Sequence, residues 1–233
     1  MEASFMKITY LGHSALEVQL NDDTNLLIDP FISGNPAVEI ELDMLHPDYI
    51  LLTHGHYDHL GDTVELAKAN QSTVVAMMEL TKYIAKKGIK QVHGLNLGGG
   101  YDFPFGRVTL TPALHSSGIE EEGQLIYLGE AAGIILQADG KTIYHAGDTA
   151  DFSDLALIGE RYEIDIAFLP IGDNFTMGPK EALSAAKRLH AKKVVPVHYN
   201  TFPAIQQDPD AFIASLSDQN GIVMHIGDTI EVS

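Results

Sequence analysis

We expect the chain to fold as an α/β protein of two mixed β-sheets packed face to face, with helices on the outside. Three observations predict this class. Strand and helix patterns alternate through two comparable halves, which divide near residue 120. Side chains that commonly bind metals follow several of the strand patterns. With 233 residues, 45% of them hydrophobic, the chain can bury a large core. We therefore predict a single domain over residues 1–233.

The residue pattern of the first half predicts short strands and two helices. The strand patterns lie at 7–10, 15–20, 26–28, 49–52 and 73–76. One helix is expected at 63–69, with Asp62 as its N-cap and Glu65 as the partner in a capping box. The other is expected at 78–87 and ends at Gly88. Gly98, Gly99 and Gly100 lack the spacing of a phosphate-binding loop, so we interpret them as a turn.

The second half repeats this alternation. Strand patterns or short apolar runs lie at 108–114, 131–137, 142–145, 164–169, 193–197, 222–224 and 229–232. Asp139-Gly140 predicts a two-residue hairpin turn between two of these strands. Helices are expected from a cap at Ser153 to about Arg161, over 179–189 with Pro179 in the first turn, and from Asp208 toward 216.

The segment Thr-His-Gly-His-Tyr-Asp-His at 53–59 places His54, His56, Asp58 and His59 directly after an apolar strand. Imidazole and carboxylate are ligands that zinc prefers and that manganese or iron also accept. In extended backbone His54 and His56 project to the same side and can chelate one ion. Asp58 and His59 are better placed to reach a second ion. The spacing therefore predicts a two-metal site, with centres about 3.5–4 Å apart, rather than a histidine-rich surface loop.

Three further candidates stand at the ends of strand patterns. His115 follows the pattern at 108–114, Asp148 comes shortly after Ile143-Tyr144, and His198 follows the pattern at 193–197. Polar groups at the carboxyl ends of strands commonly form active sites in α/β proteins. We expect these three side chains to complete the metal site.

The order of these motifs resembles that of the metallo-β-lactamase-fold hydrolases, and the resemblance covers essentially the whole chain. It is closest to a branch of metal-dependent hydrolases that is similar to the ascorbate-phosphate lactonase-like proteins. Four segments carry this closer likeness, namely Gly-His-Ser at 12–14, Ile-Asp-Pro at 28–30, Ile-Gly-Asp-Asn-Phe-Thr-Met-Gly-Pro at 171–179 and His-Tyr-Asn-Thr-Phe-Pro at 198–203.

The resemblance implies a four-layer αβ/βα sandwich and a ligand set for two divalent metal ions, with zinc expected and manganese or iron as alternatives. One ion would be held by His54, His56 and His115, the other by Asp58, His59 and His198, with Asp148 bridging. The expected reaction is hydrolysis of a small ester, lactone or phosphodiester by a hydroxide held between the two metals. Asp58 would orient that hydroxide or accept its proton.

Further residues are assigned to the surroundings of the metals. His13 is expected to take part in catalysis or face the substrate, and Asp29 to accept a hydrogen bond from a ligand histidine. His145 is expected to support the ligands from behind. Neutral donors for substrate are expected at Asn174, Tyr199 and Asn200, with hydrogen bonding within their loops as the alternative. Four histidines are expected outside the site: His46, His93, His190 and His225.

Composition narrows the partners and the location. A formal charge of −18 disfavours nucleic acid, so a small-molecule substrate is expected, and a homo-oligomer stays open. No apolar run approaches the length of a membrane span, and residues 1–5 lack a secretory pattern, so we expect a cytoplasmic protein without membrane partners. The absence of cysteine excludes disulfides and thiolate ligands.

Two alternatives to a hydrolase stay open on the sequence. A di-iron redox protein of the same fold would typically carry a carboxylate where His56 stands, and no flavin domain follows. A metal-binding or regulatory protein without turnover is disfavoured by the intact set of candidate ligands.

Overall fold

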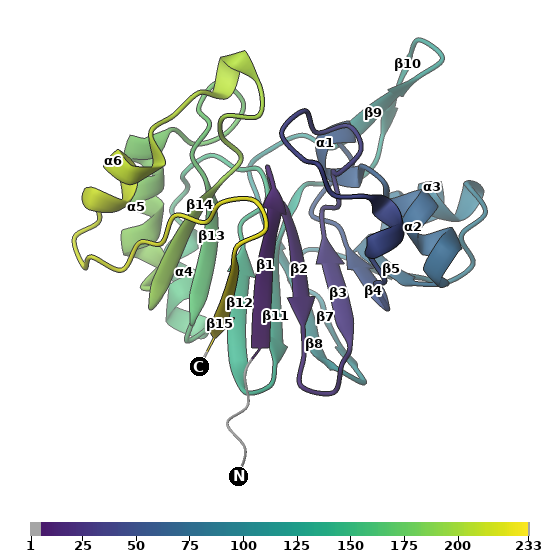
Figure 1. Ribbon diagram of the computed structural model, residues 1–233, viewed down its shortest axis with the longest axis horizontal. Coiled ribbons are helices and arrows are strands. Elements are labelled where there is room, and N and C mark those ends of the chain that lie inside the picture. The colour runs from purple at the N-terminus through teal and green to yellow at the C-terminus, as the bar shows by residue number, and fades with distance from the viewer. Residues whose placement is uncertain (1–5, 233) are drawn as a thin grey trace.

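Two β-sheets face each other at the centre of the computed structural model, which describes residues 6–232, and helices lie outside them (Figure 1). Residues 1–5, on which the expected absence of a secretory signal depends, and residue 233 lie outside the described part. This arrangement confirms the predicted α/β class with two mixed sheets and outer helices.

The first sheet carries the N-terminal strands and the last strand of the chain. Its order is β15 (Thr229–Val232), β1 (Met6–Gly12), β2 (Ala15–Gln19), β3 (Asn25–Ile28), β4 (Tyr49–Leu51), β5 (Thr73–Met77) and β6 (Val92–Leu95). The strands from β15 to β3 pair antiparallel, and those from β3 to β6 pair parallel.

The second sheet has the order β14 (Lys193–Val197), β13 (Ile166–Pro170), β12 (Lys141–His145), β11 (Ala132–Ala138), β8 (Gly106–Pro112) and β7 (Gly100–Phe103). Pairing is parallel from β14 to β12 and antiparallel from β12 to β7. A separate hairpin of β9 (Gly118–Glu121) and β10 (Gln124–Tyr127) projects from the body at the upper right of Figure 1.

The helices cover the outer faces of both sheets. Helices α2 (Thr63–Asn70) and α3 (Met78–Lys86) contact the first sheet, and α4 (Leu155–Arg161), α5 (Pro179–Leu189) and α6 (Pro209–Ala214) cover the second. The short α1 (Tyr57–Leu60) and two 3₁₀ turns, Leu42–Met44 and Pro203–Ile205, lie in loops. Within residues 6–232 no helix combines the length and the apolar character needed to cross a bilayer.

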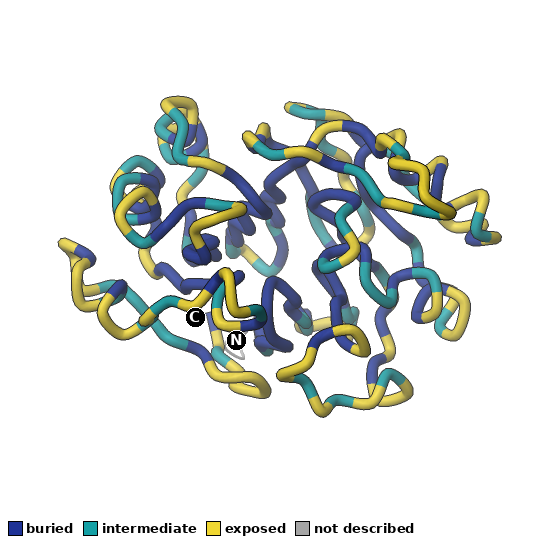
Figure 2. The backbone as a smooth tube through the Cα atoms, turned by 90° about the horizontal axis from the view of Figure 1, so that it is seen from above, coloured by how far each residue is buried: buried dark blue, intermediate teal, exposed yellow. Residues whose placement is uncertain are grey.

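The largest hydrophobic core lies between the two sheets. Ile28 and Leu51 from the first sheet pack in one cluster with Leu136 and Phe168 from the second. A second cluster joins the outer face of the second sheet to α4, α5 and α6. Seen from above, the buried backbone runs through the centre and the exposed segments form the periphery (Figure 2). Burial of apolar surface in these two layers is the main stabilising contribution to the sandwich.

Several local predictions are confirmed for clear physical reasons. Asp139 and Gly140 both have positive φ, 52° and 71°, the geometry of a type I′ turn between β11 and β12. Pro179 starts α5, where its missing N–H costs no helical hydrogen bond. The Asp208 side chain accepts a hydrogen bond from the Ala211 N–H and caps α6.

Other local predictions are wrong. Asp62 occupies the predicted N-cap position of α2, but its carboxylate makes no capping hydrogen bond and instead accepts from the Ser33 hydroxyl and from the N–H groups of Ile32 and Ser33. Asp154, not Ser153, occupies the N-cap of α4. The expected strand at 222–224 is absent from the described chain except for a single bridge at Gly221. Strands β6, β7, β9 and β10 were not predicted, and the chain changes sheet between β6 and β7, before residue 120.

The sheet directions bring six strand ends to one edge. In the first sheet β1, β3 and β4 run in the same direction, and in the second sheet β8, β12 and β14 do so. The loops after these strands carry the seven predicted metal ligands, in residues 54–59, His115, Asp148 and His198, together with His13 and Asp29. The topology therefore positions one site from loops far apart in the sequence.

Candidate metal centre

Two groups of four side chains meet at this edge, and each could hold a metal ion. We call His54, His56, His115 and Asp148 the outer group, and His13, Asp58, His59 and His198 the inner group. Within each group the ligand atoms lie within 4.8 Å of one another. The seven residues predicted as metal ligands are all present, and the structure adds His13 to them.

Asp148 is the junction between the groups. Its carboxylate oxygens lie 3.1 Å from His198 Nε2 and 3.3 Å from His59 Nε2 in the inner group. They lie 3.5 Å from His115 Nε2 and 3.8 Å from His54 Nε2 in the outer group. Asp148 is buried, so no solvent shell competes for these contacts. This is the position expected of a carboxylate that serves two ions.

The inner group is braced by side chains outside it. The Asp29 carboxylate accepts a hydrogen bond of 2.7 Å from His59 Nδ1 and two more from the N–H and hydroxyl of Thr53. Within the group, His13 Nε2 lies 3.1 Å from Asp58 Oδ2, and His13 is in turn held from outside by the Thr201 hydroxyl, 2.8 Å from its Nδ1. Asp29 therefore lies where a carboxylate can fix the ring of a ligand histidine.

The backbone at three strand ends is left-handed, with φ of 55° at His13, 47° at Asp29 and 56° at His198. Non-glycine residues adopt this conformation at a cost, and it recurs at functional sites. Here it turns the chain sharply at the strand end, and the three side chains reach the inner group.

The outer group is more open. His54 Nε2 lies 2.9 Å from His56 Nδ1, and His115 Nε2 lies 3.2 Å from the same atom. His54 is fully buried, whereas His56 and His115 are partly exposed. Support from outside the group comes from hydroxyls, since Thr53 contacts His54 and Ser116 contacts His56.

Electrostatics separate the two groups. Burial lowers the pKa values of His54, His56 and His115, so these rings are neutral at pH 7 and available as ligands. Burial also opposes protonation of His59 and His198, but Asp148 outweighs it and raises the pKa of His198 to about 9 and that of His59 well above its usual value. A metal ion must displace these protons to bind.

The remaining inner residues are shifted as well. Burial, followed by the neighbouring His198, lowers the pKa of His13 to about 4. Burial would raise the pKa of Asp58, but the hydrogen bond from His13 and the nearby His198, whose Nε2 lies 3.7 Å from Asp58 Oδ2, lower it below its usual range. Asp58 is therefore a carboxylate at neutral pH, as a metal ligand or proton acceptor requires.

Unpaired buried atoms test whether the residues fit metal ions. In the described part of the chain, His59 Nε2, His198 Nε2, His198 Nδ1 and Asp148 Oδ1 are buried without a hydrogen-bond partner. Such atoms are costly to bury unless something satisfies them. His59 donates from Nδ1 to Asp29, so its Nε2, which faces Asp148, is the atom that could bind a metal ion once its proton is displaced. Imidazoles and carboxylates without thiolates match zinc, manganese or iron.

A pocket of about 340 Å³ opens above Asp148. Besides ligand-type residues it is lined by Tyr57, Ser116, Phe175 and Phe202. Sequence reasoning missed all four. Phe175 and Phe202 lie inside segments that carry the family likeness, and this was the available signal for them.

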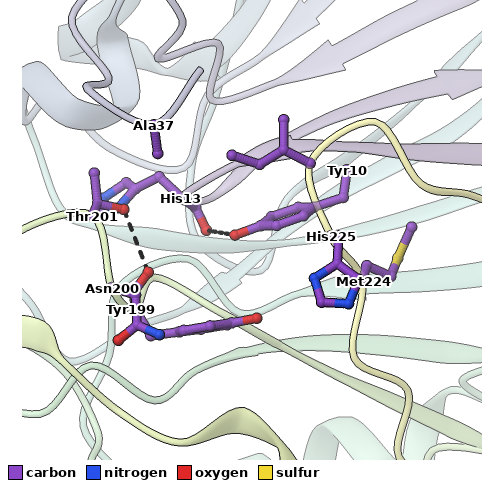
Figure 3. A pocket seen from close by; sticks show the side chains of 9 residues that line it. Tyr10, His13, Ala37, Tyr199, Asn200, Thr201, Met224 and His225 are labelled. Carbon is purple, nitrogen blue, oxygen red and sulfur yellow. Dashed lines mark hydrogen bonds between the residues drawn. The ribbon is translucent and has the colours of Figure 1, made fainter. Parts of the chain in front are cut away.

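Three residues expected to bind substrate do not line this pocket. Asn174 is exposed in a left-handed loop, and the neighbouring Phe175 reaches the pocket instead. Tyr199 and Asn200 line a separate pocket of about 240 Å³ (Figure 3). His13 contributes to that second pocket as well as to the inner group. The Asn200 side chain accepts a hydrogen bond from the Gln207 N–H, in line with the alternative of loop hydrogen bonding.

His145 does not support the ligands through their side chains. Its Nε2 donates to the Ser14 carbonyl at 2.9 Å and its Nδ1 accepts from the Gly147 N–H at 3.1 Å. It therefore fixes the loops beside His13 and Asp148 through the backbone. The four other histidines lie outside both groups: His46, His93, His190 and His225.

Comparisons with known proteins agree with this geometry. Residues 24–199 match the family described as the beta-lactamase superfamily domain. The chain is 54% identical to a UPF0173 metal-dependent hydrolase of Enterococcus faecalis over 227 residues, which covers 97% of this chain and 100% of that protein. It is 53% identical to a UPF0173 metal-dependent hydrolase of Bacillus subtilis over 229 residues, with 97% of this chain and 100% of that protein covered.

A solved structure extends the comparison. Igni18, a metallo hydrolase from the archaeon Ignicoccus hospitalis, is 35% identical and superimposes with a TM-score of 0.89, covering 98% of this chain and 99% of that one. The family match, the full-length relatives and this solved structure agree with one another. The chain therefore belongs to the metallo-β-lactamase superfamily and is a metal-dependent hydrolase.

Proposed function

We propose that this protein hydrolyses a small ester, lactone or phosphodiester with two divalent ions, one in each group, and that Asp148 serves both. Zinc is the expected metal, with manganese or iron as alternatives. The observation that carries the proposal is the contact of Asp148 with four histidines from both groups beneath an open pocket.

When bound, two such ions would lower the pKa of a water toward neutrality and offset charge on the reacting oxygens. The protein's own residues hold and orient that chemistry. Asp58 lines the pocket as a carboxylate and accepts a hydrogen bond from His13, so it can take a proton from the nucleophilic water. Asp29 keeps the His59 ring in place from behind.

The pocket and the charge support a compact substrate. A volume of about 340 Å³ lies at the small end of ligand pockets. A net charge of −18 repels polyanions over long range, so nucleic acid stays an unfavourable partner in this proposal. The cytoplasmic location stays a prediction.

The test is metal analysis combined with a substrate panel. We expect about two ions per chain after mild loading, and chelator-sensitive hydrolysis of at least one chromogenic ester, lactone or phosphodiester. A tRNA precursor assayed beside them should be cleaved negligibly at physiological salt. Faster chelator-sensitive cleavage of the RNA would replace the proposal with a nuclease, and a protein that binds no metal would end it.

A further inference from the structure

Aromatic rings form the wall of the pocket above the two groups. Tyr57, Phe175 and Phe202 line it, and none of the described residues that line it is a lysine or arginine. We infer, on the basis of the proposed function, that this wall selects substrates with a neutral aryl group beside the bond that is cleaved. Tyr57 and Phe202 are then the residues that determine specificity.

The wall is held by ring contacts. Phe31 is buried behind it, with its ring centroid 5.7 Å from that of Tyr57 at an interplanar angle of 88° and 6.3 Å from that of Phe202. Tyr57 and Phe202 lie 6.5 Å apart, and Phe202 also lies edge-on to His13 at 5.7 Å. These distances fall in the range that aromatic pairs prefer.

Two glycines fix the position of Phe31. A Cβ at Gly34 would lie 2.5 Å from the Phe31 ring. Gly61 has φ of 43°, and a Cβ there would lie 2.7 Å from the Phe31 Cα and 2.3 Å from the Pro30 carbonyl oxygen. The chain therefore approaches Phe31 closely from two sides, and the wall behind Tyr57 and Phe202 has a defined shape.

The outer members of the wall are open to solvent. Tyr57 is 57% exposed and Phe175 is 58% exposed, although large aromatic side chains are usually covered. An aryl group in the pocket would cover both rings and form edge-to-face contacts with them. A methyl or other small alkyl group would leave most of that apolar surface in water.

Charge excludes the anionic members of the same class. Apart from the histidines of the metal-binding groups, the described residues that line the pocket offer no cation to a carboxylate or phosphate on the substrate. The net charge of −18 adds repulsion at long range. A negative group on the far side of an aryl ring would therefore lie against apolar rings without a counterion.

The kinetic test measures hydrolysis by the metal-loaded protein of three ester substrates: phenyl acetate, methyl acetate and 4-carboxyphenyl acetate. We expect phenyl acetate to exceed 4-carboxyphenyl acetate in kcat/KM by about tenfold. Tyr57→Leu and Phe202→Leu should each reduce the phenyl-to-methyl ratio about three- to tenfold relative to wild type, the loss expected for one aromatic contact. Tyr101→Leu removes a partly exposed aromatic ring that lies outside this pocket and should leave the ratio unchanged.

A binding experiment separates this inference from the proposed function. Saturation-transfer NMR and titration with benzamide, acetamide and 4-carboxybenzamide need no turnover. We expect benzamide to bind most tightly, and Tyr57→Leu and Phe202→Leu to weaken it while Tyr101→Leu does not. If benzamide binds in this way but no ester is hydrolysed, the proposed function fails and the aryl pocket stands. The inference is overturned if esters are hydrolysed but both variants keep the wild-type phenyl-to-methyl ratio and the wild-type affinity for benzamide. It is also overturned if 4-carboxyphenyl acetate or 4-carboxybenzamide is preferred over its uncharged counterpart.

Discussion

The outer and inner groups use similar side chains in different surroundings. The inner group is buried apart from Asp58, and a carboxylate from outside, Asp29, holds its histidine His59. The outer group has two partly exposed histidines, His56 and His115, and its external support comes from hydroxyls. Both groups have four candidate ligands, but neighbouring side chains hold the inner group firmly and the outer group only weakly.

This difference in support suggests different roles for the inner and outer groups. Charge pairing raises the pKa values of His59 and His198 in the inner group, whereas burial lowers those of His54, His56 and His115 in the outer group. A braced site holds its geometry before metal binds, and a weakly braced site can adjust. We therefore expect the inner group to set the position of the centre and the outer group to adjust around substrate.

The largest expected effect comes from removing the residue that the groups share. Asp148→Ala should lower hydrolysis by more than about 100-fold, since losing even a residue that only supports a metal ligand typically costs 10–100-fold. Metal content measured on the same sample should fall for both groups. His46→Ala changes an exposed histidine outside both groups and serves as the control. Equal losses in the two variants would show that Asp148 does not join the groups.

The second prediction compares one histidine from each group in the metal-free protein. His59→Ala leaves Asp29 and Asp148 as buried carboxylates without their cation, and should destabilise the fold by about 3 kcal/mol. His56→Ala removes a partly exposed ring and should cost under about 1 kcal/mol. Urea denaturation followed by circular dichroism measures both. Similar losses would mean that the inner group is not the more strongly braced one.

The sequence could predict the fold class and the seven candidate metal ligands because these depend on local patterns. The segment at 53–59 carries His54, His56, Asp58 and His59 after an apolar strand, and its spacing alone indicates metal binding. The hairpin at Asp139-Gly140 likewise depends on the conformational preferences of two neighbouring residues.

What could not be predicted depends on contacts between distant segments. Nothing local distinguishes Asp62 as a helix cap from Asp62 as an acceptor for the loop at Ser33. The His13 side chain reaches Asp58 because β1 and β4 run in the same direction, which a linear reading does not show. Tyr199 follows a candidate ligand, His198, yet lines a different pocket, because the strained backbone turns the chain between them.

The third prediction weakens the brace without touching either group. Asp29→Asn keeps the size of the side chain but removes the charge that faces His59 Nδ1, and should weaken binding of one metal ion about 10- to 100-fold. The second ion should be affected less, so a stepwise metal titration should show its two phases further apart. Asp165→Asn removes a carboxylate that accepts a hydrogen bond from the Thr142 N–H and pairs with Lys192, remote from the site, and is the matched control. Parallel weakening of both phases would show that Asp29 supports the whole site.

The smallest effect concerns protons. His198 faces Asp148, Asp58, His59 and His13, and its pKa is raised to about 9 from an ordinary value near 6.5. The pairing of protonated His198 with Asp148 therefore stabilises the metal-free protein fully below about pH 6.5 and is lost as the pH rises through about 9. The contribution of this pair to the Tm of the metal-free protein should decline over that pH window.

Metal binding depends on the same His198 proton, but metal affinity should rise with pH whereas the stability of the metal-free protein should fall. Because the ion requires a neutral imidazole, binding at pH 7.5 should release about one proton from His198 and a further one from His59, and the apparent affinity should rise with pH up to about 9. The outer histidines should release none, since burial already keeps them neutral. Calorimetry in two buffers with different ionisation enthalpies counts the protons. His198→Gln should lower the count by about one and His115→Gln should leave it unchanged. Zero release in the wild type at pH 7.5 would mean that the inner histidines are neutral before metal binds, and that the electrostatic difference between the two groups does not exist.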